Sequence, residues 1–174
     1  MTHAGQLVIP GCTNWGVDSL TISNAWLQFS NEGLALTVTN DLTVTGAGAG
    51  LELGQRTLYN PDALAWNYYA SSMTTGLAVS VGGNLLLTNG ASLYIACGVT
   101  NLASPYGAAI SVTGDVFIGS GSWIQPFSQG TNGGSAYFWM RNLAVAAGGG
   151  FDADGRGCRG GATAADGFGA GRGK

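Results

Sequence analysis

The acidic residues are the first candidates for chemistry, because a carboxylate can bind a cation or transfer a proton. Of the nine acidic residues, only Asp152 and Asp154 lie close together, in the stretch FDADGRG. An Asp-x-Asp-Gly turn supplies oxygen ligands on flexible backbone, which calcium accepts, but the further ligands and closing Glu of an EF-hand loop do not follow. Two interpretations stay open for this pair: a calcium site, or a solvated glycine-rich loop with turn-forming acids.

The sequence offers little for catalysis, and we predict no catalytic residue and no enzymatic activity. The single histidine, His3, lies next to the first residue, where it gives no basis for a histidine-dependent triad. Cleavage of a glycosidic bond needs two positioned carboxylates. Asp152 and Asp154 could share one face of a strand, but no matching set of partner residues accompanies them. We keep a carbohydrate-active enzyme as the alternative interpretation.

Aromatic side chains form a second group of candidates. The stretch 54–76, GQRTLYNPDALAWNYYASSMTTG, combines them with Asn and Asp, and Tyr106 occurs in a second loop, NLASPYG. Flat rings can stack on the apolar faces of sugars while amides bind hydroxyls, but the same residues also pack a loop against a domain. Both interpretations, glycan binding and packing, stay open. The candidate glycan-binding residues are Tyr59, Trp66, Tyr68, Tyr69 and Tyr106.

Composition and charge exclude several classes of partner. Only 9% of the residues are charged and the net charge is −3, so no basic stripe exists to neutralise phosphates and we expect no nucleic-acid partner. No apolar run reaches the roughly 18 to 20 residues that span a bilayer, and the first residues, MTHAGQLVIPG, lack the features of a signal peptide. Three widely separated cysteines, Cys12, Cys97 and Cys158, indicate neither a disulfide framework nor a metal site. Apart from calcium, we expect no cofactor.

The elements that would position these residues follow from a repeated pattern. Five stretches begin with a short polar residue, continue as an alternating apolar strand, turn, and continue as a second short strand. Such alternation is typical of a strand with one buried face. A third alternating strand precedes most copies; in YFWMRN, either Trp139 or Met140 could point inward. Equivalent positions are Leu20, Leu42, Leu85, Val116 and Leu143 in the first strand, and Leu27, Leu51, Leu93, Trp123 and Phe151 in the second.

Five copies with similar turns predict an all-β fold, a right-handed parallel β-helix. We expect a single-stranded solenoid of about five coils with three short strands per coil, in which like positions stack about 4.8 Å apart. Asn and Asp at the corners would bond to nearby backbone amides. These corner residues are Asp18, Asp41, Asn84, Asp115 and Asn142. An antiparallel β-sandwich is the alternative.

The domain organisation follows from the spacing of the copies. The two strands of a copy keep a nearly constant offset, so the variable length falls between the second strand of one copy and the third strand of the next. We predict a β-helix domain at 1–153 with insertions at about 54–76, 96–107 and 126–135, and a glycine-rich tail or loop at 154–174. Insertions at one corner emerge on one face, which is often a binding face.

The strings DLTVTGAGAGLELG, GNLLLTNGASLYI and GGGFDADGRGCRGG resemble the β-helical repeats of large bacterial secreted or cell-surface proteins. The resemblance is to the pectin-lyase-like, adhesin-like and autotransporter-passenger-like types, and it covers most of the chain. It concerns the style of the repeats rather than a catalytic motif. It implies a segment of a longer exported protein, located outside the cell or at its surface. Neighbouring coils of that protein, polysaccharide and cell-surface glycans would be its partners.

These observations predict one leading function and leave two alternatives. The leading function is that of a non-catalytic structural or adhesive segment of an exported β-helical surface protein, contacting glycans through loops on one face. The first alternative is a pectin-lyase-like carbohydrate-active enzyme, which would need two carboxylates in a groove. The second is a truncated reading frame with no independent function, whose exposed strand edges would cause aggregation.

Overall fold

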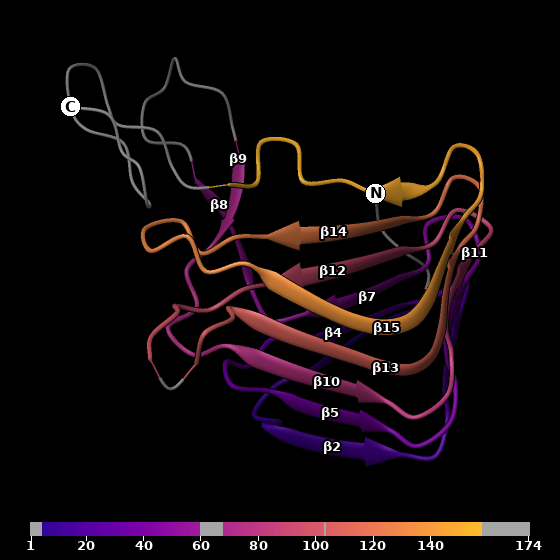
Figure 1. Cartoon of the computed structure of the whole chain (residues 1–174), viewed down its shortest axis with the longest axis horizontal. Helices are drawn as coiled ribbons and strands as arrows, with labels where there is room; N and C mark the ends of the chain where they lie inside the picture. Colours follow the sequence, from indigo (N-terminus) through magenta and orange to yellow (C-terminus); the bar gives the residue numbers. More distant parts are fainter. Residues whose placement is uncertain (1–4, 60–67, 103, 158–174) are drawn as a thin grey trace.

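The structure, a computed structural model, describes residues 5–59, 68–102 and 104–157, and the regular structure within these ranges is β-strand throughout (Figure 1). A six-stranded sheet consists, in spatial order, of β1 (Gln6–Ile9), β4 (Trp26–Phe29), β7 (Gly50–Leu53), β12 (Ser92–Ala96), β14 (Trp123–Phe127) and β16 (Gly150–Phe151).

An eight-stranded sheet contains, in spatial order, β2 (Asn14–Val17), β5 (Ala35–Val38), β10 (Leu77–Val81), β13 (Ala108–Ile118), β11 (Leu85–Thr88), β6 (Leu42–Thr45) and β3 (Leu20–Ser23), while β15 (Ala136–Val145) pairs with β13. A small antiparallel pair, β8 (Arg56–Tyr59) and β9 (Tyr68–Ser71), completes the described strands.

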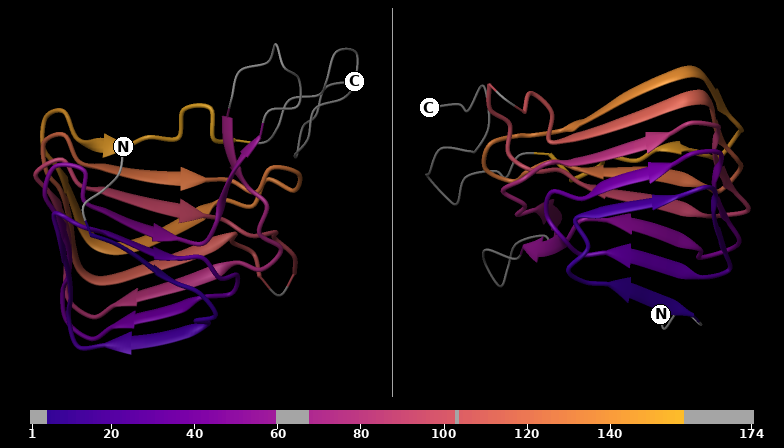
Figure 2. Two further views of the ribbon diagram at one scale, coloured as in Figure 1. Left: turned by 180° about the vertical axis from the view of Figure 1, so that it is seen from behind. Right: turned by 90° about the horizontal axis from the view of Figure 1, so that it is seen from below.

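The two large sheets form two layers (Figure 2). Their inner faces are buried in a shared apolar core. Period-two alternation explains this arrangement, because every second side chain of a strand points to the same side. In β10, for example, Leu77, Val79 and Val81 are buried whereas Ala78 and Ser80 are exposed. The core is therefore built from stacked rows of Leu, Val and Ile.

The register of the first predicted strand is confirmed. Leu20 pairs with Leu42, Leu42 with Leu85, Leu85 with Val116, and Val116 with Leu143. In the second strand Leu27, Leu51, Leu93 and Phe151 are also equivalent, but the position predicted for Trp123 belongs to Ile124. Trp123 instead shares its outward row with Gly50 and Ser92.

The predicted fold class is wrong. The described strands form two layered parallel sheets of six and eight strands, not a single-stranded β-helix with three short strands per coil. β13 and β15 run without interruption through the expected corner, where a register shift between Val112 and Asp115 absorbs the bend, and so join two predicted strands into one sheet. The antiparallel sandwich is wrong as well, because every pair within the large sheets is parallel.

The description of the chain as a repeat solenoid with pectin-lyase-like or adhesin-like features is wrong for the same reason as the β-helix. That description depended on separate three-strand coils, and the layered sheets do not supply them. What the repeated pattern did encode is the parallel register, since equivalent positions pair from strand to strand. The same pattern thus fixes which residues are neighbours without fixing how many sheets they form.

A ladder of polar side chains marks the bend of the eight-stranded sheet. Asn84 donates from its backbone N–H and its side-chain amide to Oδ1 of Asp41, at 2.7 and 3.2 Å, and accepts the backbone N–H of Asp115 at 3.0 Å. Asn142 then donates to Oδ1 of Asp115 at 2.8 Å. The expected bonding to a backbone amide is confirmed for Asp41 and Asn84, whereas Asp115 accepts side-chain hydrogen bonds from Asn142 and Arg141.

The extra chain length lies between β7 and β10, between β12 and β13, and between β14 and β15. Each of these connections leads from the six-stranded sheet to the eight-stranded sheet. The first contains the β8–β9 pair, which Figure 1 shows beside the ends of the sheets. A search of the described residues finds no helix long and apolar enough to cross a membrane.

Candidate functional site

The outer face of the eight-stranded sheet carries two hollows floored by small side chains. One, of about 240 Å³, includes Ala35, Ala78, Ala109 and Tyr106 in its lining. The other, of about 390 Å³, includes hydroxyl side chains of three neighbouring strands. We name the floor the small-residue face and define it by Ala35, Ala78, Ala109, Thr37, Ser80 and Ser111.

The parallel register puts these six residues in two rows. Ala35 pairs with Ala78 and Ala78 with Ala109, while Thr37, Ser80 and Ser111 pair in the same way two positions further along the strands. Neighbouring strands are roughly 4.8 Å apart, so each row extends directly across the sheet. A run of small side chains on three strands leaves a shallow depression, because no long side chain rises to fill it.

On the next strand, β15, aromatic residues occupy the corresponding positions of both rows. Tyr137 pairs with Ala109 and Trp139 pairs with Ser111, and both aromatic side chains are exposed, Trp139 to 52%. Tyr106, from the loop before β13, stacks on Tyr137 with ring centroids 4.2 Å apart and an angle of 14° between the rings. The small-residue face therefore ends at a border of three aromatic side chains, Tyr106 from the loop before β13 and Tyr137 and Trp139 from β15. We name this border the aromatic step.

The face is polar but uncharged. Thr37, Ser80 and Ser111 supply hydroxyl groups, each of which can both donate and accept a hydrogen bond. Among the described residues, those that line the two hollows include no Asp, Glu, Lys, Arg or His. A ligand that carries hydroxyl groups and no charge matches this surface better than a phosphate or a carboxylate does.

The structure places the predicted aromatic residues unequally. Tyr59 lies in β8 and pairs in the backbone register with Tyr68 of β9, where Leu58 pairs with Tyr69. Trp66 lies outside the described residues. Tyr106 is exposed and is the one predicted residue whose side chain is placed in a candidate site, beside Tyr137.

Tyr137 and Trp139 were missed as candidates. The sequence YFWMRN left it open whether Trp139 or Met140 points inward, and the structure shows that Met140 packs against the core while Trp139 is exposed. The signal that could have found them is the register itself. Aligning β15 with β13 puts Tyr137 and Trp139 at outward positions occupied by Ala109 and Ser111.

The outer face of the six-stranded sheet is covered rather than open. The guanidinium of Arg56 lies 4.2 Å from the ring centroid of Tyr94 and donates to both carboxylate oxygens of Glu52, at 2.8 and 3.1 Å. The guanidinium of Arg156 lies over Phe127, 4.7 Å from its ring centroid. Arg56 lies near the start of the first insertion, so this insertion packs on the six-stranded sheet from its beginning.

The pair predicted to hold calcium is engaged in other contacts. Asp152 forms an ion pair with Arg156 at 2.8 Å through Oδ2, while its Oδ1 accepts the backbone N–H of Asp154 at 3.1 Å. The main-chain oxygen of Asp152 also accepts a hydrogen bond from Arg156. Both acids line a hollow of about 340 Å³ with Trp123 and Phe151, but no group of three or more metal-ligating side chains occurs among the described residues. This geometry is that of an Asx turn closed by an arginine.

The shifted pKa values of Asp115 and Cys97 reflect structural contacts and burial rather than a reactive site. Hydrogen bonds from Arg141 and Asn142 lower the pKa of the Asp115 carboxyl below its usual value. Burial raises the pKa of the Cys97 thiol to about 12, so the thiolate that would act as a nucleophile is not populated near neutral pH. Neither Asp115 nor Cys97 lines the two hollows of the small-residue face.

No family model, no curated protein and no solved structure matches the chain. The resemblance to bacterial surface proteins thus has no support from a matched relative. The geometry of the small-residue face and its aromatic step is the basis for the functional conclusion.

Proposed function

We propose that the chain is a non-catalytic module that binds a neutral glycan on the small-residue face. The observation that carries the proposal is the aromatic step, in which an exposed Tyr106–Tyr137 stack and an exposed Trp139 border a floor of Ala, Ser and Thr. Exposed aromatic rings offer apolar surface with polar tips, which suits the amphipathic faces of sugars. A role outside the cell or at its surface is part of the same proposal.

Several features of the face support a sugar over another ligand. The hydroxyl row of Thr37, Ser80 and Ser111 offers donors and acceptors at regular intervals, as a chain of sugar hydroxyls requires. The absence of charged side chains among the described lining residues favours neutral over acidic polysaccharides. Shallow, open hollows fit an extended polymer that lies across the strands, rather than a small ligand that needs enclosure.

Trp139→Ala and Tyr137→Ala test the proposal directly. The full chain is screened against immobilised neutral and acidic polysaccharides, and the affinity for the best neutral glycan is measured by titration calorimetry. We expect each substitution to weaken binding at least about tenfold, corresponding to roughly 1.4 kcal/mol. Ala78→Trp, which fills the floor with a large side chain, should abolish binding.

Phe117→Ala is the matched control, because Phe117 is an exposed aromatic residue of β13 on the far side of the bend. It should bind as the unaltered chain does. The proposal is wrong if no neutral polysaccharide binds the unaltered chain, or if Trp139→Ala, Tyr137→Ala and Ala78→Trp bind as Phe117→Ala does. Equal affinity for acidic and neutral glycans would overturn its assignment of the ligand class.

A further inference from the structure

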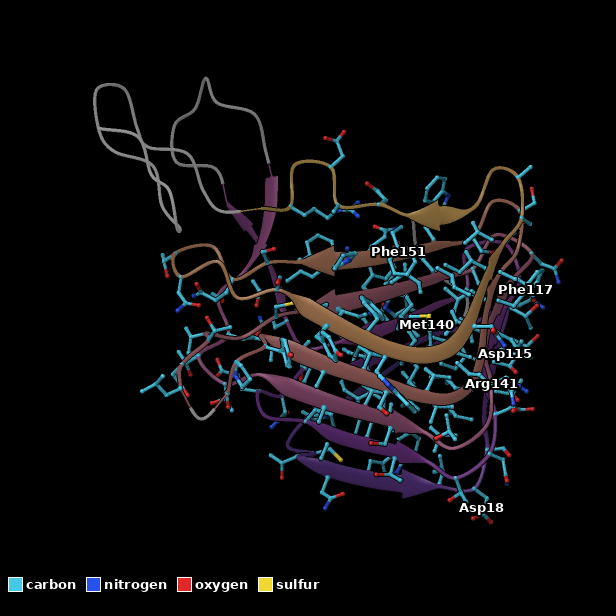
Figure 3. All side chains as sticks on the ribbon, in the orientation of Figure 1. Asp18, Asp115, Phe117, Met140, Arg141 and Phe151 are labelled. Atoms are coloured by element: carbon cyan, nitrogen blue, oxygen red, sulfur yellow. The ribbon has the colours of Figure 1, made fainter. Side chains whose placement is uncertain are left out.

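One end of the apolar core is open. Leu143 and Phe151 point inward, as their paired neighbours Val116 and Ile124 do, yet they are 47% and 38% exposed whereas those neighbours are buried. Val145 is exposed in the same way. These residues lie on β15 and β16, the last strands of the two sheets. Figure 3 shows Phe151 and Met140 at this end, which we name the β15 end.

The opposite end of the core, formed by β1, β2 and β3, is open as well. Leu7 points inward like its partner Leu27, but it is 58% exposed whereas Leu27 is buried. Trp15 and Val17 are only partly buried against the core. We name this the β1–β3 end. Both ends also present strand edges whose N–H and C=O groups can accept a further parallel strand.

The two ends carry opposite charges at the same position of the strand pattern. Asp18 lies two residues before Leu20, and Arg141 lies two residues before Leu143. Leu20 and Leu143 belong to one row that runs across the paired strands. Arg141 is exposed at the β15 end, and Asp18 is exposed at the β1–β3 end (Figure 3). Arg141 donates through Nε to Asp115 at 2.8 Å, and a guanidinium has further N–H groups for a second carboxylate.

We infer that the β15 end of one copy of this chain docks on the β1–β3 end of a second copy. In that arrangement β3 of the second copy extends the eight-stranded sheet beyond β15 in the existing parallel register. Leu20 of the second copy then covers Leu143, and Asp18 of the second copy meets Arg141. The complementarity of charge and apolar row at the two ends is what selects a second copy as the occupant.

The interface is heterologous, because different surfaces of the two copies meet. A contact of this kind leaves an unused end on each side, so further copies add and the product is an open filament rather than a closed dimer. The small-residue faces of successive copies would then be continuous, since Gly16 pairs in the outward row of Thr37 and would follow Trp139.

Charge reversal at each end tests the docking. Sedimentation velocity on the full chain over a wide range of concentrations should show a series of oligomers that lengthens with concentration. Arg141→Glu faces Asp18 with a like charge, and Asp18→Arg faces Arg141 with a like charge, so each variant should associate about tenfold more weakly or not at all. An equimolar mixture of the two variants should associate again, because every contact in an alternating filament then joins opposite charges.

Leu143→Lys tests the apolar part of the interface and should block elongation at the β15 end. Leu102→Lys is its control, because Leu102 is a fully exposed leucine of the loop between β12 and β13, away from both ends. Circular dichroism spectra and melting curves establish that each variant folds. A chain that stays monomeric at every concentration overturns the inference. A closed dimer, or a mixture of the reversed variants that associates no better than either alone, also overturns it.

Discussion

The outer faces of the two large sheets both consist of parallel strands, but one face is covered by side chains and the other is exposed. On the six-stranded sheet, Arg56 and Arg156 lie over Tyr94 and Phe127, and Glu52 is buried beneath Arg56. On the eight-stranded sheet, Ala, Ser and Thr form the floor and the aromatic step stands exposed. Aromatic residues occur on both faces, so their presence alone does not mark a binding site.

The difference lies in what the connections between the sheets do. Arg56 enters from the first insertion and Arg156 from the segment after β16, and both cover aromatic rings that would otherwise be exposed. Tyr106 enters from the second insertion but stacks at the border of the small-residue face and leaves the floor open. A covered aromatic residue contributes to stability, whereas an exposed one is available to a ligand. This contrast can be tested by substitution.

The largest expected difference is between the effects of Phe127→Ala and Trp139→Ala on the free energy of unfolding. Phe127 is 1% exposed beneath two arginines, so its truncation should lower the free energy of unfolding by about 3 to 5 kcal/mol through lost burial and a cavity. Trp139→Ala should change it by less than about 0.5 kcal/mol. Urea unfolding of both variants measures the contrast. Similar losses would mean that the exposed aromatic step is part of the packing and would weaken the glycan proposal.

Much of the fold was predictable at the level of strands and pairs. Alternation gave the buried positions, and the polar residue before each first strand gave the register that joins Leu42 to Leu85 and Leu85 to Val116. The number of sheets was not predictable, because it depends on whether the chain breaks its hydrogen bonding at the bend. Asp115 was expected at a corner, yet β13 continues through it. Local residue types do not determine that outcome, because it depends on pairing with the neighbouring strands.

The site was predictable only in part. Tyr106 was found because its loop, NLASPYG, was expected to lie on the same face as the aromatic stretch 54–76. Tyr137 and Trp139 lie within a strand pattern, YFWM, in which a shift of one residue exchanges the buried and exposed sets. The small-residue face has no signal along the chain, because Ala35, Ala78 and Ala109 become neighbours only through pairing.

Arg56→Met probes how the covered face is held together, and a smaller effect is expected. Removing the guanidinium leaves the buried Glu52 carboxylate without its bidentate partner, which should cost about 1 to 3 kcal/mol of unfolding free energy. The double variant Arg56→Met with Glu52→Gln should recover part of this loss, because no buried charge is then left unpaired. Additive losses in urea unfolding would show that the two side chains act independently.

The exposed ion pair of Asp115 and Arg141 provides the smallest effect and a contrast with the buried pair of Glu52 and Arg56. Since the hydrogen bonds from Arg141 and Asn142 lower the pKa of Asp115 in the folded chain, the stability from these contacts is present above the usual pKa of an aspartate, about 3.9. It is lost as the pH falls through the lowered pKa. The urea midpoints of the unaltered chain and Asp115→Asn, measured in dilute protein, should differ at about pH 6 and converge toward about pH 2.5. Added salt should narrow the difference at the higher pH, because both side chains are exposed. A difference that does not change with pH would assign the effect of the substitution to the polar ladder at the bend rather than to the charge of Asp115.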